Sequence, residues 1–361
     1  MKIDIQSLDL TSFKLKEGII NGKKVFLINP CDFDCKWTVD NLNLRSLIVD
    51  EEGNVISNSL PKFFNFSEKP DLYPPLEKYN DWVLESKIDG SLVACDYIFD
   101  GFNAKTRGTI SYKSLTNAAD FDFVFDKYPN IINVCRANPD DTFLFEITSP
   151  KNIIILRYTD EPDIKFLGFI NKPTGLYYPA YSNEGILIKN IIGCESPEIY
   201  QIKGNITDIS NEVKGWVGRE GIVLKYNNNQ NFVKLKADWY LRLHRLKSEL
   251  SSQEKIMDVW FSQNKPSYDD FYNYILNTFD YELAEYCKEN ITKIIDAYDK
   301  VKDNISRMKE VVIPLLSLSR KDSALIILEN YKCHSSYLFK LLSGKELDDK
   351  DIRKLLISFL E

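Results

Sequence analysis

The chain has 361 residues, of which 44% are hydrophobic and 27% charged, a balance that is ordinary for globular proteins. This length favours two domains over one. The longest apolar runs, Ile153–Leu156 and Val311–Leu316, are far shorter than the about 20 residues that cross a bilayer. The polar start of the sequence does not resemble a secretory signal, so we expect a cytoplasmic protein.

Charge and residue usage restrict the chemistry further. A net charge of −7 argues against a generally basic surface that coats nucleic acid, but it leaves room for a local basic groove. Only Cys31 and Cys35 among the seven cysteines are close in sequence, and no second Cys or His pair completes a zinc site. We expect reduced, mostly buried thiols. Because only His244 and His334 are present, a mechanism has to be built from Lys, Arg, Asp and Glu.

Up to about residue 240 the sequence shows short strand patterns separated by turn signals. Two apolar strands within residues 13–29 flank Asn21-Gly22, the dipeptide best suited to a type I′ hairpin. Turns at residues 50–54 and at Asp100-Gly101 mark two further strand pairs. Helices are expected at Leu115–Ala137 and Ile206–Val217. The remaining predicted strands are Trp82–Leu84, Leu92–Ile98, Thr142–Thr148, Ile153–Tyr158, Ile164–Ile170, Ile222–Tyr226 and Phe232–Lys236.

After Lys236 the pattern becomes helical. Glycine nearly disappears, and apolar residues recur at spacings of three and four. Ser267 is placed to cap one helix, and Lys345–Phe359 predicts another. One amphipathic helix carries the face Ile291, Ile294, Ile295, Tyr298, Val301 and Ile305. The sequence therefore predicts an α+β protein with a strand-rich domain over residues 1–245 and an all-α domain over residues 246–361.

The string from Glu85 to Leu92 contains a lysine suited to nucleophilic chemistry. An amine attacks phosphorus only when it is deprotonated, and the ordinary lysine pKa of about 10.4 opposes this. Burial and neighbouring cations lower that pKa and would activate Lys87. Gly90 lets the backbone approach a nucleotide, and Asp89 can orient a ribose or the lysine. Taken alone, Lys-x-Asp-Gly equally fits an ordinary turn between strands.

Charged residues on three later strands strengthen the hypothesis. Lys234 and Lys236 are two apart, so both point to one face of a strand, where they can neutralise a phosphate. The alternative is the solvated face of an edge strand. Glu220-Gly221 opens the preceding strand. Glu146 interrupts an apolar strand, where a charge is costly to bury without a partner; an exposed glutamate is the alternative.

Taken in chain order, the strings around Lys87, Glu146, Glu220 and Lys234 resemble those of the covalent nucleotidyltransferase superfamily of RNA ligases, DNA ligases and mRNA capping enzymes. Lys87-Ile-Asp-Gly matches motif I, Phe145-Glu146 motif III, Glu220-Gly-Ile-Val motif IV and Lys234-Leu-Lys236 motif V. The longer strings KIDGSLV, PKFFNF, EGIVLK and FVKLKADWYLRLH are similar to those of the bacteriophage RNA ligase 1 family, over roughly residues 40–248. The resemblance implies a nucleotidyltransferase fold, with ATP-grasp-like antiparallel sheets, for the first domain.

The activity that the resemblance implies is ATP-dependent joining of 5′-phosphate and 3′-hydroxyl RNA ends. Lys87 attacks the α-phosphorus of ATP, the AMP passes to the 5′-phosphate of RNA, and the 3′-hydroxyl then displaces AMP. Mg²⁺ is expected, with Mn²⁺ as a substitute, held mostly through water by Glu146 and Glu220. The implied setting is RNA or tRNA repair on cleaved tRNA, after an upstream polynucleotide kinase-phosphatase, by a monomer in the host cytoplasm if the source is a phage or virus.

The resemblance also implies roles for the motif residues. Lys87 is the nucleophile, and Glu146 is similar to the residue that contacts the ribose. Glu220 resembles a carboxylate near the metal and the lysine, and Lys234 and Lys236 resemble the α-phosphate contacts.

Basic residues outside these motifs resemble phosphate contacts as well. Arg45 and Lys62 are similar to residues that grip the outgoing β- and γ-phosphates, a task that suits bidentate arginine. Lys105 and Arg107 resemble the basic pair that follows motif I. A surface arginine remains the alternative for Arg45, since Ser46 stands where the family usually has glycine, and a solvated strand face remains the alternative for the pair.

The helical domain is a candidate for RNA selection, with Arg242, Arg245 and Lys247 as possible phosphate contacts or simply a solvated helix face. One competing function is a GTP-dependent capping guanylyltransferase, against which the absence of a recognisable OB-fold pattern counts. Another is a catalytically silent module that binds RNA or nucleotide, although all three motif lysines are present. A scaffold protein would leave the four ordered motifs unexplained.

Overall fold

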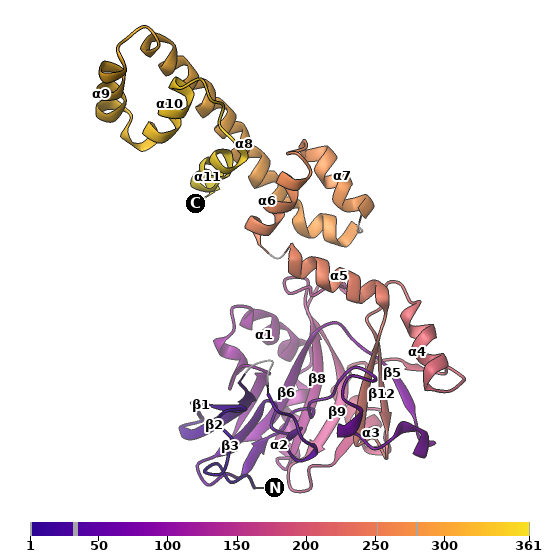
Figure 1. The fold of residues 1–361 in the computed structure, drawn as a ribbon. Helices are drawn as coiled ribbons and strands as arrows, with labels where there is room; N and C mark the ends of the chain where they lie inside the picture. Colours follow the sequence, from indigo (N-terminus) through magenta and orange to yellow (C-terminus); the bar gives the residue numbers. More distant parts are fainter. Residues whose placement is uncertain (1, 32–34, 251, 279–280, 361) are drawn as a thin grey trace. The chain divides into compact units, whose positions relative to one another are not determined.

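The computed structural model describes residues 2–31, 35–250, 252–278 and 281–360, and the chain divides into two compact units, Met1–Arg242 and Leu243–Glu361 (Figure 1). Antiparallel sheets build the first unit and helices build the second, which confirms the α+β class. The dividing point falls within α5 (Asp238–Glu249), near the predicted boundary between residues 245 and 246.

A four-stranded antiparallel sheet opens the first unit, in the order β1-β2-β3-β4. Its strands are β1 (Phe13–Ile20), β2 (Lys23–Pro30), β3 (Leu47–Asp50) and β4 (Val55–Ser57). Asn21 and Gly22 both have positive φ, 46° and 80°, as a type I′ turn requires, so the predicted hairpin is confirmed.

Two more antiparallel sheets follow, with strand orders β10-β9-β8-β6-β7 and β11-β5-β12-β13. The five-stranded sheet consists of β6 (Ser91–Ile98), β7 (Gly101–Thr106), β8 (Asp141–Thr148), β9 (Asp163–Asn171) and β10 (Tyr177–Pro179). The other sheet consists of β5 (Val83–Ser86), β11 (Ile199–Tyr200), β12 (Gly221–Tyr226) and β13 (Asn231–Lys236).

Helices cover the outer faces of these two sheets, and their inner faces meet. The helices α1 (Ala118–Lys127), α2 (Asn130–Ala137) and α3 (Asn183–Ile192) pack on the five-stranded sheet, and α4 (Ile206–Lys214) packs on the other. Between the sheets, Ala94 and Leu144 form one apolar cluster with Val223 and Phe232. Successive residues of a strand point to opposite faces, so each strand supplies both layers.

Three sequence predictions for this unit differ from the structure. The helix predicted over Leu115–Ala137 is two helices, because Pro129 begins a new one after the turn at Tyr128. The helix predicted to Val217 ends at Lys214, where Gly215 follows. The strand predicted at Ile153–Tyr158 is wrong. This segment has no strand pairing, since the N–H groups of Ile155 and Leu156 donate to Asp89 instead.

The second unit consists of helices and their connecting segments, with no strand among its described residues. Its helices after α5 are α6 (Gln253–Ser262), α7 (Tyr268–Thr278), α8 (Tyr281–Leu315), α9 (Arg320–Asn330), α10 (Ser335–Leu342) and α11 (Asp349–Leu360). Trp260, Ile291 and Ile294 are completely buried in a single core, so the predicted apolar face of α8 is confirmed. Ser267 caps α7, since its Oγ accepts the N–H of Asp270 at 3.2 Å.

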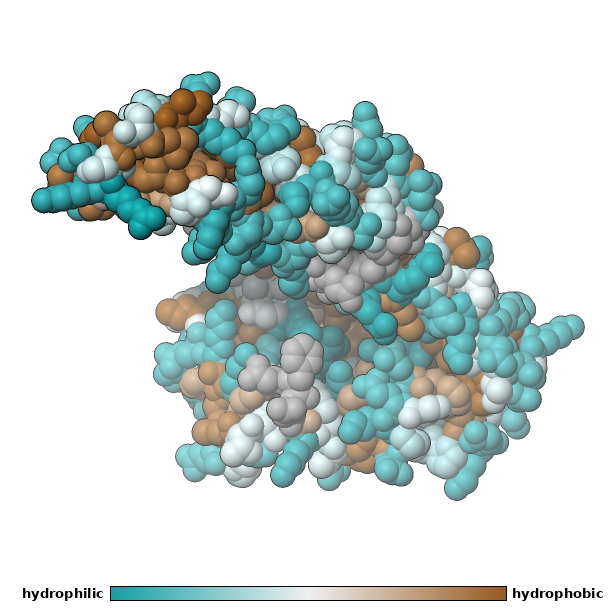
Figure 2. Space-filling view, turned by 45° about the horizontal axis from the view of Figure 1, so that its top comes forward, coloured by the Kyte–Doolittle hydropathy of each residue, from teal (hydrophilic) through white to brown (hydrophobic). Residues whose placement is uncertain are grey.

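Exposed apolar side chains of this unit concentrate around α9. Ile313, Leu316 and Leu328 are each more than half exposed, and Figure 2 shows apolar side chains gathered over that end of the unit. None of the helices in the described ranges has the length and the low charge of a membrane span. Short 3₁₀ helices occur at Val39–Asn41, Pro70–Leu72, Leu76–Lys78, Tyr112–Ser114 and Lys332–His334.

A buried carboxylate joins the first sheet to the second. Asp96 on β6 is fully buried and accepts hydrogen bonds from Ser57 on β4 and Thr142 on β8, and Lys172 Nζ lies 3.1 Å from its Oδ1. Because each of these polar groups is buried, none can exchange its partner for water.

We therefore expect Asp96→Ala to lower the free energy of unfolding of the first unit by about 3–5 kcal/mol, because it removes the buried carboxylate that pairs with Lys172 and accepts from Ser57 and Thr142. Urea unfolding followed by tryptophan fluorescence measures this, since four of the five tryptophans precede residue 243. Asp126→Ala on the exposed side of α1 is the control and should change the value by about 0.5 kcal/mol or less. Equal effects of the two variants would contradict the role of Asp96.

Candidate active site

Charged side chains replace apolar ones at one end of the space between the two facing sheets. On β8, Leu144 belongs to the apolar cluster between the sheets, and Glu146 lies two residues further on the same face. On β13, Phe232 belongs to that cluster, and Lys234 and Lys236 follow it on the same face. The alternation of side chains that builds the core therefore also places Glu146, Lys234 and Lys236 at the same end of the space between the sheets.

Lys87 follows directly after β5 and is fixed by the neighbouring strand. Its backbone N–H donates to the carbonyl of Gly221 at 3.0 Å. Gly221 has φ +144°, and a Cβ there would lie 2.1 Å from the carbonyl oxygen of Leu235. Only glycine fits this conformation and this contact, and the backbone path through it leads to Glu220, whose side chain meets Lys87.

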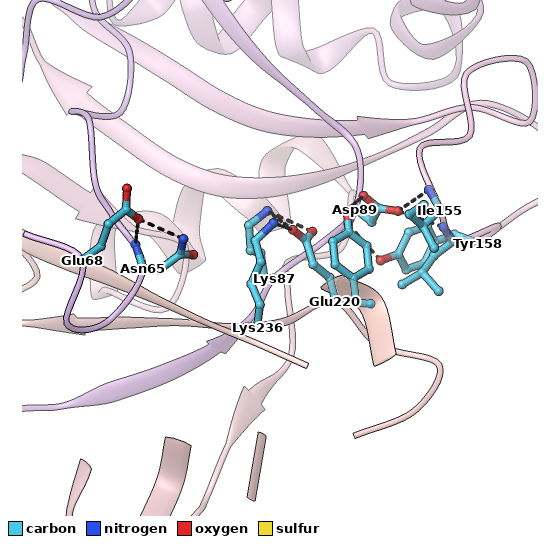
Figure 3. Close-up of polar contacts among 10 residues, drawn as sticks. Asn65, Glu68, Lys87, Asp89, Ile155, Tyr158, Glu220 and Lys236 are labelled. Atoms are coloured by element: carbon cyan, nitrogen blue, oxygen red, sulfur yellow. Dashed lines mark hydrogen bonds and ion pairs between the residues drawn. The ribbon is translucent and has the colours of Figure 1, made fainter. Parts of the chain in front are cut away.

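The Glu220 carboxylate bridges two ammonium groups. Its oxygens lie 2.9 Å from Lys87 Nζ and 2.8 Å from Lys236 Nζ, and its side chain is only 2% exposed (Figure 3). Burial by itself lowers the pKa of Lys87, but the carboxylates of Glu220, Glu146 and Asp89 outweigh it and raise that pKa above its ordinary value. The prediction that the surroundings lower the pKa of Lys87 is therefore wrong for this arrangement.

A cavity of about 390 Å³ opens beside Lys87. It brings together most of the residues predicted from the sequence, and it adds an apolar wall that the sequence analysis did not assign, with Phe63 against Phe232 at a ring distance of 5.6 Å. Its predicted members are Lys87, Gly90, Glu146, Lys234, Arg45, Lys62 and Arg107, and its apolar members are Leu60, Phe63 and Leu92. The surface-arginine alternative for Arg45 does not hold, because its guanidinium is largely buried and lines this cavity.

Two groups of the cavity have a pKa near neutrality. Burial, together with the positive charges of Lys62, Lys87, Lys236 and Arg45, lowers the pKa of Lys234 to about 7. Burial raises the pKa of Glu146 to about 7, although Lys87 opposes the shift. Cations outnumber carboxylates along the cavity, where Lys87, Lys234, Arg45, Lys62 and Arg107 stand with Glu146.

Gly90 is required by the close approach of β8. A Cβ on Gly90 would lie 2.4 Å from the carbonyl oxygen of Ile147 and 3.0 Å from Cγ of Glu146. The glycine therefore lets Glu146 and the turn after Lys87 lie side by side, as expected from its place in the string.

Lys105 does not line the cavity, unlike Arg107 two residues later. It is buried, 1% exposed, and its ammonium donates to the backbone carbonyl of Ser46. Burial lowers the pKa of Lys105 to about 7. Ser46 has φ +59°, a conformation that favours glycine, and its N–H donates to Asn29 Oδ1 at 2.9 Å. Lys105 thus holds the backbone next to Arg45 and is neither a ligand of the cavity nor part of a solvated face.

Asp89 is engaged within the protein. Its Oδ2 accepts the N–H groups of Ile155 and Leu156 at 2.7 and 2.8 Å, and its Oδ1 accepts the hydroxyl of Tyr240 at 2.6 Å. Its own N–H donates to the hydroxyl of Tyr158 at 2.9 Å (Figure 3). Asp89 therefore anchors the loop after Lys87, a role that the sequence analysis did not assign to it.

The two carboxylates predicted as metal contacts differ in their surroundings. Glu220 already pairs with two ammonium groups, whereas Glu146 lines the cavity. In the described part of the chain no group of three or more His, Cys, Asp and Glu side chains is arranged to hold a metal ion. A hydrated cation at Glu146 fits this donor set better than a dedicated protein cage.

Comparison with known proteins finds viral relatives, while no family model matches. The chain is 26% identical over 250 residues to the "Putative bifunctional polynucleotide kinase/RNA ligase" of Autographa californica nuclear polyhedrosis virus, over 64% of this chain and 33% of that protein. It is 30% identical over 174 residues to "Uncharacterized protein ORF64" of Ostreid herpesvirus 1 (isolate France), over 45% of this chain and 42% of that protein. The chain thus spans well under half the length of these relatives.

Among solved structures, an archaeal ATP-dependent RNA ligase has a TM-score of 0.49 and 14% sequence identity to this chain. The similarity covers 92% of this chain and 93% of that one.

The ion pair between Lys87 and Glu220 leads to a testable prediction about the pKa of Lys87. In Glu220→Gln the largest influence that raises the pKa of Lys87 is gone and burial remains, so we expect that pKa to fall. The reactivity of Lys87 toward an amine-specific reagent, followed peptide by peptide across a pH series, should shift to lower pH. The exposed Lys203 is the internal reference. A profile for Lys87 that stays in place or moves to higher pH would refute the assignment.

Proposed function

We propose that this protein is an ATP-dependent RNA ligase that works through a covalent adenylate on Lys87. The observation that carries the proposal is the convergence of Lys87, Glu146, Glu220 and Lys234, which lie on four separate strings, around one cavity with a cationic wall. The similarity to a viral protein named for kinase and RNA ligase activities supports the same chemistry. The narrower affiliation with the phage RNA ligase 1 family remains a prediction from the motif strings.

The first step of this reaction needs a neutral Lys87. Glu220 lies 2.9 Å from Nζ and is placed to accept the proton that the amine gives up. Lys236 Nζ lies 2.8 Å from Oε1 of the same carboxylate and holds it in position. Attack of Nζ on the α-phosphorus then releases pyrophosphate and leaves AMP on the lysine.

The other residues in and beside the cavity are suited to different parts of the bound nucleotide. Lys234 and Lys236 are suited to the α-phosphate, where negative charge increases during the transfer. Arg45, Lys62 and Arg107 are suited to the β- and γ-phosphates. The apolar wall, made of Leu60, Phe63 and Leu92, fits a purine base, and Glu146 is placed for the ribose or for a hydrated Mg²⁺ or Mn²⁺. The metal would neutralise phosphate charge during the transfer.

The later steps and their setting follow from the same proposal. The 5′-phosphate of RNA takes the AMP from Lys87, and a 3′-hydroxyl then displaces AMP to form the phosphodiester. Cleaved tRNA is the proposed substrate, and a polynucleotide kinase-phosphatase would prepare its ends, an idea supported by the kinase in the name of the viral relative. We further propose that the helical unit selects the RNA and that the protein acts as a monomer in the cytoplasm.

Label transfer tests the proposal. The protein is incubated with Mg²⁺ and each α-labelled nucleoside triphosphate and then separated on a denaturing gel. We expect label from ATP alone, lost when 5′-phosphorylated RNA is added, and no label on Lys87→Ala, because the nucleophile is missing.

The exposed Lys203→Ala is the matched control and should be labelled like the natural protein. Label from GTP would establish guanylyltransferase chemistry instead. No label from any nucleotide would favour a silent binding module, and a labelled Lys87→Ala protein would exclude Lys87 as the nucleophile.

Nucleotide binding should be accompanied by proton uptake. Burial, together with the surrounding cations, lowers the pKa of Lys234 to about 7. A bound triphosphate opposes the field of those cations and so raises the pKa toward its ordinary value. At pH 8 the empty site therefore holds Lys234 largely neutral and the complex holds it protonated. Calorimetric titration with ATP in buffers of different ionisation enthalpy measures this uptake, which Lys234→Met should reduce by about one proton at most. Equal uptake in both proteins would show that another group titrates.

A further inference from the structure

A second cavity, of about 1100 Å³, adjoins the cavity at Lys87. The two share four lining residues, the cations Arg45, Lys62 and Arg107 together with Gly108. All of its walls belong to the first unit. They come from β1, from β2 and the residues after it, and from the segments before β3, after β4 and after β7. The cavity is nearly three times as large as the one beside Lys87, so it can hold far more than the end of a triphosphate.

The additional walls are strongly basic. Lys14, Lys16, Lys36 and Lys69 line this cavity and are all exposed to solvent. Lys14 and Lys16 are two apart on β1 and so share one face, where their ammonium groups approach only backbone carbonyls, at 3.4 and 3.5 Å. None of the four forms an ion pair with a carboxylate of the described residues, so their positive charges are not neutralised within the described chain.

One described carboxylate lines the same cavity, and it is already engaged. Glu68 Oε2 accepts the N–H of Asn65 at 3.0 Å and its side-chain amide at 2.9 Å (Figure 3). Among the described residues, seven cations therefore face the cavity against a single acidic side chain. In a protein of net charge −7 this local excess selects polyanions.

Aromatic rings stand among these cations. Trp37 and Phe64 line the cavity, and the Lys62 ammonium lies 5.9 Å and 4.6 Å from their ring centres. Cations that follow a phosphate backbone, combined with aromatic rings for stacking bases, are typical of sites for single-stranded nucleic acid. A site for inorganic phosphate or pyrophosphate alone would have no use for the rings.

The geometry of the proposed reaction indicates which strand enters. In phosphoryl-type transfer the attacking and leaving groups lie roughly in line across the phosphorus. Pyrophosphate leaves opposite Lys87 in the first step. In the second step Lys87 is the leaving group, so an oxygen of the RNA 5′-phosphate has to approach from the side that pyrophosphate vacated. That side is the wall of Arg45, Lys62 and Arg107, which continues into the second cavity.

We propose that this second cavity binds the 5′-phosphorylated RNA strand, with Lys14, Lys16, Lys36 and Lys69 holding the phosphates that follow the reacting end. The proposal rests on the proposed ligase function, since it assigns the strand that receives AMP. In the transfer itself the P–N bond to Lys87 breaks, the 5′-phosphate oxygen forms the new P–O bond, and the electron pair returns to the lysine nitrogen.

The test uses the full chain with Lys14, Lys16 and Lys69 changed together to Ala, called here the groove variant. Its matched control changes three exposed lysines that do not line either cavity, Lys78, Lys203 and Lys214, to Ala. Both lose three positive charges. Each protein is first loaded with labelled AMP, and transfer to a 5′-phosphorylated ten-nucleotide RNA is then followed as a function of RNA concentration and of salt.

We expect the groove variant to form the lysyl-adenylate at the same ATP concentrations as the control. Its half-saturating RNA concentration should rise at least tenfold. A plot of the logarithm of affinity against the logarithm of salt concentration should become less steep by about 2, near 0.7 for each lost phosphate contact. With a nucleoside 3′,5′-bisphosphate, which carries the reacting phosphate but no strand behind it, the two proteins should behave alike.

Equal RNA dependence in the groove variant and the control would overturn the proposal. A groove variant that needs more ATP to form the adenylate would also overturn it, because the cavity would then serve the triphosphate. If the natural protein forms no adenylate at all, the ligase function itself fails, an outcome that the loading step reports before any RNA is added.

Discussion

The first unit depends on one buried carboxylate placed between two ammonium groups. Lys87, Lys234, Lys236, Arg45 and Lys62 face a common space, and their mutual repulsion in a partly dry environment would be severe. Glu220, at 2.8 and 2.9 Å from two of them, offsets part of that repulsion and gives the lysine cluster a defined geometry. It also fixes the protonation of the intended nucleophile, so the resting site is stable but not yet reactive.

Ordinary strand geometry supplies this arrangement. The same period of two that places Leu144 and Phe232 in the core places Glu146 and Lys234 in the cavity, and the change from apolar to charged residues marks where the core ends. Glu146 and Lys234 are therefore held on rigid strands, and Lys87 and Glu220 lie directly beside the ends of β5 and β12. At Gly221 a positive φ leads into Glu220.

The parts of the site that the sequence predicted are local in the chain. Lys87, Glu146 and Lys234 stand in short strings, and the resemblance of those strings to known motifs predicted that they belong to one site. Asp89 was misread because its partners lie 66 and 151 residues away, and no spacing shows such contacts. Lys105 was misread because alternation tells which residues share a face but not whether that face is buried. The run Ile153–Tyr158 has the composition of a strand, yet the hydrogen bonds to Asp89 prevailed over strand pairing.

Arg45, Lys62 and Arg107 are shared by both cavities, and this has a kinetic consequence. Under the proposed function, two polyanions cannot occupy the same three cations at once, so we expect pyrophosphate to depart before the strand docks. Such a reaction would be ordered as a ping-pong sequence by electrostatic exclusion. Pyrophosphate would then compete with the strand, and the adenylated lysine would meet RNA only after the first product had gone.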